Sequence, residues 1–132
     1  MVVLMRALAG LCLVAVVGVG ATARGWHGGA PHSEAEQTVE IAAERFSFSP
    51  SRVRTTVGTT LTIQLQSDDT AHGFHIVGTS VDVVIPKRGR GTVTVTFTPD
   101  RAGRYTFECS QLCGAGHSFM RGTLEVAKAE AR

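Results

Sequence analysis

Two cysteines, a histidine and a methionine lie in the short segment from Cys109 to Met120, CSQLCGAGHSFM. Cys113 follows Cys109 after three residues, and His117 follows after three more. Thiolate and thioether sulfur are soft ligands and imidazole suits copper, so this set favours copper over magnesium, calcium or manganese. Methionine argues against zinc, whose structural sites use Cys, His and carboxylate. Because a single-copper blue site has only one Cys, the second Cys implies a second metal ion or a different kind of site.

A second imidazole has to come from elsewhere in the chain, and the candidate is His72 in the segment SDDTAHGFHI. His72 follows a predicted strand and a turn, so its loop can meet the loop of Cys109 at one end of a two-layered fold. Asp68 and Asp69 are typical turn formers, and Asp69 is also in position to orient the loop of His72. His75 has no evident partner and is interpreted as a structural or exposed residue.

A disulfide between Cys109 and Cys113 is the alternative use of the two thiols, and an exported location would permit it. A disulfide requires no histidine or methionine at fixed spacing, so the pattern favours the metal site. Taken alone, His72 would be an ordinary turn residue, and Met120 would be a core residue beside Phe119. Their places in the two segments favour a role as metal ligands.

The elements that must position these residues are predicted to be β-strands. Apolar and polar residues alternate through 61–66 and 92–98, and Tyr105, Phe107 and Cys109 lie in phase on the next run. Shorter runs of the same kind surround or end at Val39, Phe46, Val57, Ile85 and Val126. With turn residues between the runs and no sustained helical period beyond the N-terminal segment, the pattern predicts an antiparallel sandwich of seven or eight strands. Cys109 should enter the end of that sandwich, because it continues the inward face of its strand.

Residues 1–23 are interpreted as a signal peptide or membrane anchor. Arg6 precedes an uncharged run, Ala7 to Ala23, that ends in a small-x-small cleavage site. The run is at the lower limit of the roughly 17 to 25 residues of a spanning helix, and its many Gly and Ala residues favour cleavage. Cys12 is preceded by Leu11 rather than by the small residue of a lipoprotein site, and is read as part of the leader. Both alternatives place the remainder in the periplasm or at the outer face of the cytoplasmic membrane.

The rest of the chain has room for one domain with a modest core. We expect a polar linker at 24–37, in which His27 and His32 are solvated, the β domain at 38–127 and a short tail at 128–132. The formal charge is only +2, and basic and aromatic residues do not interleave, so nucleic-acid binding is not expected. A basic turn, IPKRGRG, carries Lys87, Arg88 and Arg90; it is interpreted as a solvated loop, with docking to a partner as the alternative.

The segments DTAHGF (69–74) and CSQLCGAGHSFM (109–120) together closely resemble the binuclear copper motif, called CuA, of cytochrome c oxidase subunit II, in its compact bacterial type. The likeness covers 38–126 and implies an all-β, cupredoxin-like Greek-key sandwich. It also implies electron transfer from a cytochrome c or a small copper protein to a haem-copper oxidase subunit I. The domain alone is not expected to be catalytic, since no haem or oxygen site is visible in the sequence.

The resemblance also implies a role for each site residue. Cys109 and Cys113 would bridge two copper ions through their thiolates. His72 would be the terminal ligand of one copper ion, and His117 that of the other. The weak ligands would be the thioether of Met120 on one ion and the backbone carbonyl of Gln111 on the other.

The chain departs from the family's usual pattern at several points. Many members have Glu at the position of Gln111, where the carboxylate also serves a magnesium site; a Gln keeps the carbonyl but argues against that magnesium. The aromatic stretch with a tryptophan that takes electrons from cytochrome c is replaced here by ERFSFSP, which leaves the donor open. Subunits of this family usually carry one or two clear membrane helices, whereas this sequence shows only the short, weakly hydrophobic N-terminal segment.

Two other functions remain open. A stand-alone periplasmic copper carrier or storage protein would need the same ligands but no electron partner, and cleavage of the leader would favour it. A thiol-disulfide protein that matures copper sites also uses two cysteines and a distant histidine, but it would have alternating helices and strands, which this chain lacks.

Overall fold

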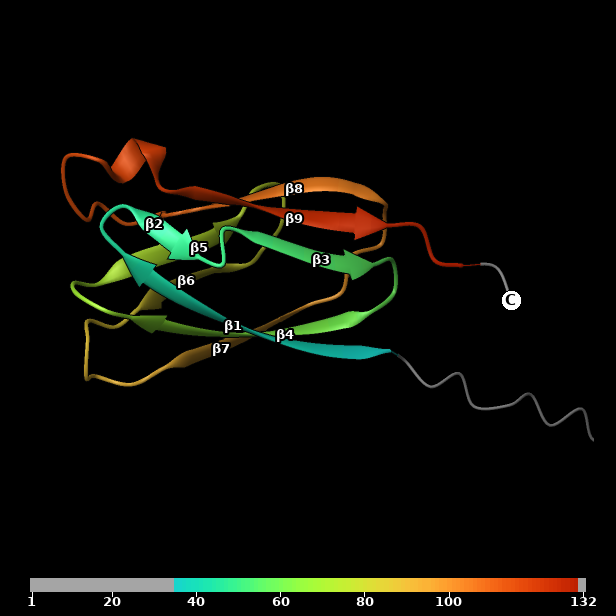
Figure 1. The fold of residues 1–132 in the computed structure, drawn as a ribbon, viewed down its shortest axis with the longest axis horizontal. Coiled ribbons are helices and arrows are strands. Elements are labelled where there is room, and N and C mark those ends of the chain that lie inside the picture. The colour runs from blue at the N-terminus through green and yellow to red at the C-terminus, as the bar shows by residue number, and fades with distance from the viewer. Residues whose placement is uncertain (1–34, 131–132) are drawn as a thin grey trace, which may run out of the picture. The chain divides into compact units, whose positions relative to one another are not determined.

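The computed structural model describes residues 35–130, which form nine strands and one short 3₁₀ helix (Figure 1). The strands are β1 (Glu36–Glu44), β2 (Ser47–Ser49), β3 (Arg52–Thr56), β4 (Thr60–Ser67), β5 (His72–Ile76), β6 (Asp82–Ile85), β7 (Val93–Phe97), β8 (Gly103–Glu108) and β9 (Arg121–Ala127), and the 3₁₀ helix is His117–Phe119. Over 35–130, no helix has the length and apolar character needed to cross a membrane. Because all described elements but one short 3₁₀ helix are strands, the predicted all-β class is confirmed.

The strands form two sheets that pack face to face. One sheet has the order β2-β1-β4-β7 and the other has the order β3-β9-β8-β5-β6. Neighbours within a sheet are mostly not consecutive in the chain, because the chain crosses repeatedly from one sheet to the other, as in Greek-key sandwiches. These crossings bring loops from both sheets to the same end of the molecule.

The expectation of a purely antiparallel sandwich is wrong for two strand pairs. β1 runs parallel to β4, in a register that starts at Glu36 and Thr60, and β3 runs parallel to β9, from Arg52 and Thr123. Between β1 and β4 the chain passes through β2 and crosses to the other sheet as β3, so it returns in the direction in which it left. Alternation reveals which residues share a face of a strand, but it carries no information on the strand's direction.

β5 is the strand that sequence analysis missed. Its segment, HGFHI, was expected to be part of a loop carrying His72, yet His72 is the first residue of the strand and pairs with Ile85 of β6. β5 lies between β8 and β6, and four of its five residues are buried. A strand covered on both faces shows no alternation of apolar and polar residues, which is why the pattern did not reveal it.

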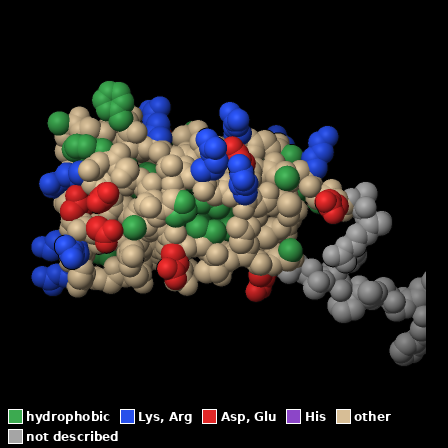
Figure 2. All heavy atoms as spheres, in the orientation of Figure 1, with side chains coloured by type: hydrophobic (Ala, Val, Ile, Leu, Met, Phe, Trp, Pro, Cys, Tyr) green, Lys and Arg blue, Asp and Glu red, His purple; other side chains and the backbone are tan. Residues whose placement is uncertain are grey.

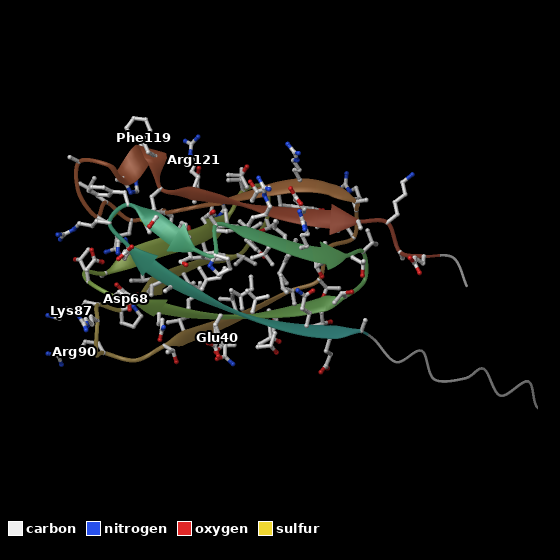
Figure 3. The ribbon with its side chains drawn as sticks, viewed as in Figure 1. Glu40, Asp68, Lys87, Arg90, Phe119 and Arg121 are labelled. Carbon is white, nitrogen blue, oxygen red and sulfur yellow. The ribbon has the colours of Figure 1, made fainter. Side chains whose placement is uncertain are left out.

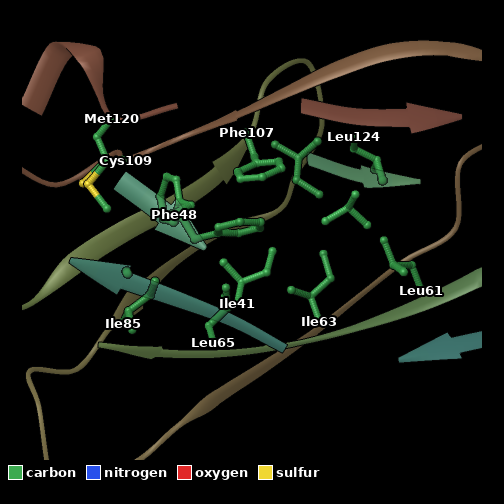
Figure 4. Packing of buried hydrophobic residues seen from close by; sticks show 14 of the residues in the cluster. Ile41, Phe48, Leu61, Ile63, Leu65, Ile85, Phe107, Cys109, Met120 and Leu124 are labelled. Carbon is green, nitrogen blue, oxygen red and sulfur yellow. The ribbon is translucent and has the colours of Figure 1, made fainter. Parts of the chain in front are cut away.

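The inward side chains of the two sheets form one core (Figure 4). Phe48, Phe74 and Phe107 pack together in it, with ring centroids 5.2 to 5.7 Å apart. Cys109 and Met120 continue the same core at one end of the sandwich (Figure 4). This arrangement confirms that Cys109 points inward. It also packs the site's sulfur-bearing side chains against the hydrophobic core.

Several predictions fall outside the described residues. These are the leader at 1–23 with Cys12 and its cleavage site, most of the linker with His27 and His32, and the last two residues of the tail. The described part begins just before β1, which starts at Glu36, and continues past the end of β9 at Ala127.

Candidate metal centre

Three connections meet at the end of the sandwich where Cys109 leaves β8. The β8–β9 connection runs from Cys109 to Met120 and contains the 3₁₀ helix. The β4–β5 connection ends at His72, and the β1–β2 turn contributes Arg45 and Phe46. Figure 1 shows these connections at the end opposite to the one where β1 begins. Residues that lie far apart in the sequence are thereby brought together.

Two thiols and one imidazole form the centre of this cluster. One ligand atom each from His72, Cys109 and Cys113 lie within 4.8 Å of one another, and all three residues are buried. The two sulfur atoms are 3.6 Å apart, much farther than the roughly 2.05 Å of a disulfide bond, so both thiols are free. A single metal ion could reach both sulfur atoms at about 2.3 Å, a usual metal–thiolate bond length.

The other three predicted ligands surround this centre. The Sγ atom of Cys113 lies 3.9 Å from Nδ1 of His117 and 3.8 Å from Sδ of Met120. The thiol of Cys109 donates a hydrogen bond to the backbone carbonyl of Gln111, at 3.0 Å. The fold therefore gathers all six predicted residues around the two sulfur atoms.

The ring of His72 is oriented by Asp69. Nε2 of the ring donates to Oδ1 of Asp69 at 2.7 Å, which leaves Nδ1 as the ring's acceptor nitrogen. Nδ1 is fully buried and has no hydrogen-bond partner among the described residues. A buried acceptor without a partner costs free energy, and a metal ion held between this nitrogen and the nearby thiolates would satisfy it. The donor set therefore fits a soft metal ion such as copper.

The carboxylate of Asp69 is suited to this task. Burial by itself raises its pKa, but the hydrogen bond from His72 and those from the backbone N–H groups of Arg45 and Thr70 outweigh burial, so the pKa lies below its ordinary value. Asp69 thus stays ionised and accepts the ring proton of His72. Histidine ligands in metal sites usually have such a partner, which fixes their tautomer and orientation. The expectation that Asp69 orients this loop is confirmed.

The thiol of Cys113 is protonated when no metal is bound. Burial, together with the neighbouring thiol of Cys109, raises the pKa of Cys113 from 9.0 to about 11. A metal ion bonds the thiolate, so binding must release this proton. The sulfur of Cys113 is therefore uncharged near neutral pH until a metal ion displaces its proton.

Gly73 allows the cysteine loop to lie directly on β5. A Cβ atom at this position would be 2.5 Å from the backbone nitrogen of Gln111 and 2.7 Å from that of Ser110. The backbone N–H of Gly73 also points at Cys109, with 3.4 Å between nitrogen and sulfur. Ser110 is held in turn by a hydrogen bond from its hydroxyl to Asp82, at 2.6 Å. The glycine is thus required by close approach of two backbones rather than by its own dihedral angles.

Arg45 and Phe46 are contacts that sequence analysis did not find. Nε of Arg45 donates to the carbonyl of Cys113 at 3.0 Å, across a sequence separation of 68. The ring of Phe46 covers the backbone between Cys113 and His117, where a Cβ at Gly116 would lie 2.3 Å from the ring. In the sequence, ERFSFSP was noted as a short strand-like run that lacks the family's tryptophan, and neither feature indicates a contact with the cysteine loop.

Two further expectations can be compared with the structure. Nδ1 of His75 lies 2.9 Å from the carbonyl of Val81, so His75 has the structural role that was one of its two interpretations. Lys87, Arg88 and Arg90 are exposed, as expected of a surface turn. The turn nevertheless contacts the site's surroundings, because the backbone N–H of Arg88 donates to the carbonyl of Asp69 at 3.1 Å. Lys87 and Arg90 reach outward from the same end of the sandwich as Phe119 (Figure 3).

Known proteins share both the fold and the sequence pattern. The cupredoxin-like domain family matches residues 11–126. Cytochrome c oxidase subunit 2 of Thermus thermophilus is 35% identical over 91 residues, which cover 69% of this chain and 66% of that protein, just under two thirds of its length.

Two solved structures add to this comparison. A chain of a heme-copper terminal oxidase dimer has a TM-score of 0.61 at 28% identity, over 74% of this chain and 67% of that chain. The periplasmic domain of subunit II of cytochrome oxidase from Bradyrhizobium japonicum shares the fold with a TM-score of 0.62 at 17% identity, over 69% of this chain and 83% of that chain. This chain belongs to the cupredoxin-like family, and within that family it is similar to subunit II of cytochrome c oxidase.

Proposed function

We propose that this domain binds a binuclear copper centre of the CuA type and transfers single electrons, as the electron-entry domain of a haem-copper oxidase. The observation that carries the proposal is the pair of free thiols, 3.6 Å apart and buried, with an unpartnered imidazole nitrogen beside them. Cys109 and Cys113 would bridge the two ions. His72 would complete the ligands of one ion and His117 those of the other, with the Gln111 carbonyl and the Met120 thioether as the two weak ligands.

When bound between Cys109 and Cys113, the copper pair would supply a centre that takes up and releases one electron at a time. The protein's contribution is to keep the ligands still, because small movement on electron gain or loss means a small barrier. His72 is fixed by Asp69, and Cys109 is fixed by the backbone of Gly73. The backbone N–H of Cys109 also donates to the carbonyl of Met120 at 3.0 Å, which ties the two ends of the loop together. Such outer contacts orient ligands and tune a metal's potential.

The same loop presents apolar side chains to solvent. Leu112 and Phe119 are 81% and 83% exposed, and no other exposed large hydrophobic residue described in the structure exceeds 57%. Phe119 stands out from the surface next to Arg121 (Figure 3), at an end where Figure 2 shows apolar side chains beside basic ones. A redox partner docked on these two residues would bring its cofactor close to the buried sulfur atoms. We propose this as the face that a cytochrome c or small copper protein meets.

The remaining assignments of the proposal rest on the family and on the N-terminal segment. The domain would work on the periplasmic side, held at the membrane by an uncleaved leader or by a partner such as the oxidase's subunit I. Gln111 is exposed and carries an amide where a carboxylate would serve magnesium, so magnesium is left out of the proposed centre.

The test is a copper titration of the purified full-length protein, with copper counted per chain and the electron paramagnetic resonance spectrum recorded. The expected result is two copper ions and hyperfine splitting from one electron shared by two copper nuclei. One copper ion with an ordinary localised spectrum would refute the binuclear centre and support a copper carrier, and no retained copper would refute both.

The docking face is tested separately. The double change Leu112→Ser and Phe119→Ser should leave the copper count and spectrum unchanged, because both side chains point into solvent. It should lower the second-order rate of reduction by a c-type cytochrome. The double change Val77→Ser and Val84→Ser, at exposed residues of other segments, is the matched control. Equal rates in both variants would contradict the assignment of this face.

A further inference from the structure

The β1–β2 turn contacts both loops that carry the proposed ligands. Arg45 uses its backbone N–H to donate to Oδ2 of Asp69 at 3.0 Å, and its side-chain Nε to donate to the carbonyl of Cys113 at 3.0 Å. Oδ1 of the same Asp69 accepts from His72 at 2.7 Å. One residue therefore connects Asp69, which holds the imidazole of His72, with a thiol-bearing residue of the β8–β9 connection.

The side chains of the β1–β2 turn lie against the loop that carries Cys113. The side chain of Arg45 is 53% exposed, and its Nε lies 4.0 Å from Oδ2 of Asp69 and 3.0 Å from the carbonyl of Cys113. The ring of the next residue, Phe46, lies against the loop at Gly114 and Gly116. The turn thus contacts the loop between Cys113 and His117 with a polar group and an apolar ring together.

From this geometry we propose that Arg45 is a positioning residue of the copper centre, which fixes the distance between the loop of His72 and the loop of Cys113. The inference rests on the proposed function, since it concerns the same centre. The mechanism is a hydrogen bond from a charged donor to the carbonyl of Cys113. A bond of this kind is stronger than a neutral one, and it leaves the sulfur of Cys113 less freedom to move away from that of Cys109.

Two substitutions separate the hydrogen bond from the charge. Arg45→Gln places an amide nitrogen the same number of bonds from the backbone as Nε, so it keeps a donor without the charge. Arg45→Met has nearly the same length but no donor. Arg101→Met is the matched control, because the side chain of Arg101 is exposed, pairs only with Asp100 among the described residues, and lies before β8, at the end of that strand remote from Cys109.

The experiment uses the full-length protein and three readouts. The first is the rate of copper loss to an excess of chelator, and the second is the copper hyperfine splitting. The third, in copper-free protein, is the rate at which the thiols react with an alkylating reagent. Arg45→Met should lose copper at least about tenfold faster, the lower end of what changes in outer contacts usually cause, with altered hyperfine splitting and faster alkylation. Arg45→Gln, which keeps a weaker, neutral donor, should fall between wild type and Arg45→Met, and Arg101→Met should match wild type.

The outcomes are distinct. If Arg45→Met matches wild type in all three readouts while wild type holds two copper ions, the positioning role is overturned and the proposed function stands. If Arg45→Gln is as defective as Arg45→Met, the hydrogen bond to Cys113 is not the cause and the inference fails in that form. If the wild-type protein holds no copper pair, both proposals fall.

Discussion

The close contact between Gly73 and the cysteine loop gives a sharp test of how this site is built. In Gly73→Ala, the added Cβ would lie 2.5 Å from the backbone nitrogen of Gln111, whereas ordinary contacts begin at 3.4 Å. The loop must therefore move by about 0.9 Å, the difference between these two distances. It cannot yield by a simple rotation of a side chain, because the atoms in contact include backbone nitrogens of Ser110 and Gln111.

A displacement of this size is large for a metal site. Metal–ligand distances are held to within about 0.2 Å, and the loop that moves carries Cys109 and Cys113. We therefore expect Gly73→Ala to lose one or both copper ions, or to give a localised spectrum in place of a shared one. The sandwich itself should still fold, because the core of both sheets is unchanged, although overpacking of this kind usually costs about 1–3 kcal/mol of stability.

The assay is copper counting with the paramagnetic resonance spectrum, beside thermal unfolding of the copper-free protein. Gly58→Ala is the control: it has open space around its Cβ position but a φ of +79°, so it costs about 1 kcal/mol through the backbone without moving the site. If Gly73→Ala kept two copper ions with an unchanged spectrum, the packing of the cysteine loop on β5 would not be what positions the thiols.

Three further predictions follow from the same geometry. Gly116→Ala puts a Cβ 2.3 Å from the ring of Phe46, so it should speed copper loss, and a second change, Phe46→Ala, should slow that loss again; a double variant as fast as Gly116→Ala would contradict the assigned clash. Asp69→Asn removes the carboxylate that holds Nε2 of His72 and should lower copper affinity about 10–100-fold in a competition titration, whereas unchanged affinity would contradict its orienting role. In copper-free protein, the pKa of Cys113 is raised from 9.0 to about 11, so the thiol's contribution to stability is present below pH 9 and lost as pH rises through 11. Urea unfolding should show this as a fall of up to roughly 2–3 kcal/mol that is absent in Cys113→Ser, and an equal fall in that variant would contradict it.

The residues of the candidate site could be named from the sequence because their chemistry is local. Two thiols, an imidazole and a thioether at short spacing favour copper, because the methionine argues against zinc, and the family's pattern supplied the ligand roles of His72 and the carbonyl of Gln111. The alternation in β4, β7 and β8 likewise indicated strands and put Cys109 on the inward face. Each of these inferences depends on residue type and on neighbours a few positions away.

Other features depended on the tertiary structure. Direction in the pairs β1–β4 and β3–β9 is set by where the chain crosses between sheets, and β5 was hidden because it is covered on both faces. The contact of Arg45 with Cys113 spans a separation of 68, and the choice of Nδ1 as the free nitrogen of His72 depends on where Asp69 lies. The sequence by itself determined which side chains can bind copper, because ligand chemistry belongs to single residues. The tertiary structure decided their distances, orientations and pKa values, because these arise only when segments remote in sequence pack against one another.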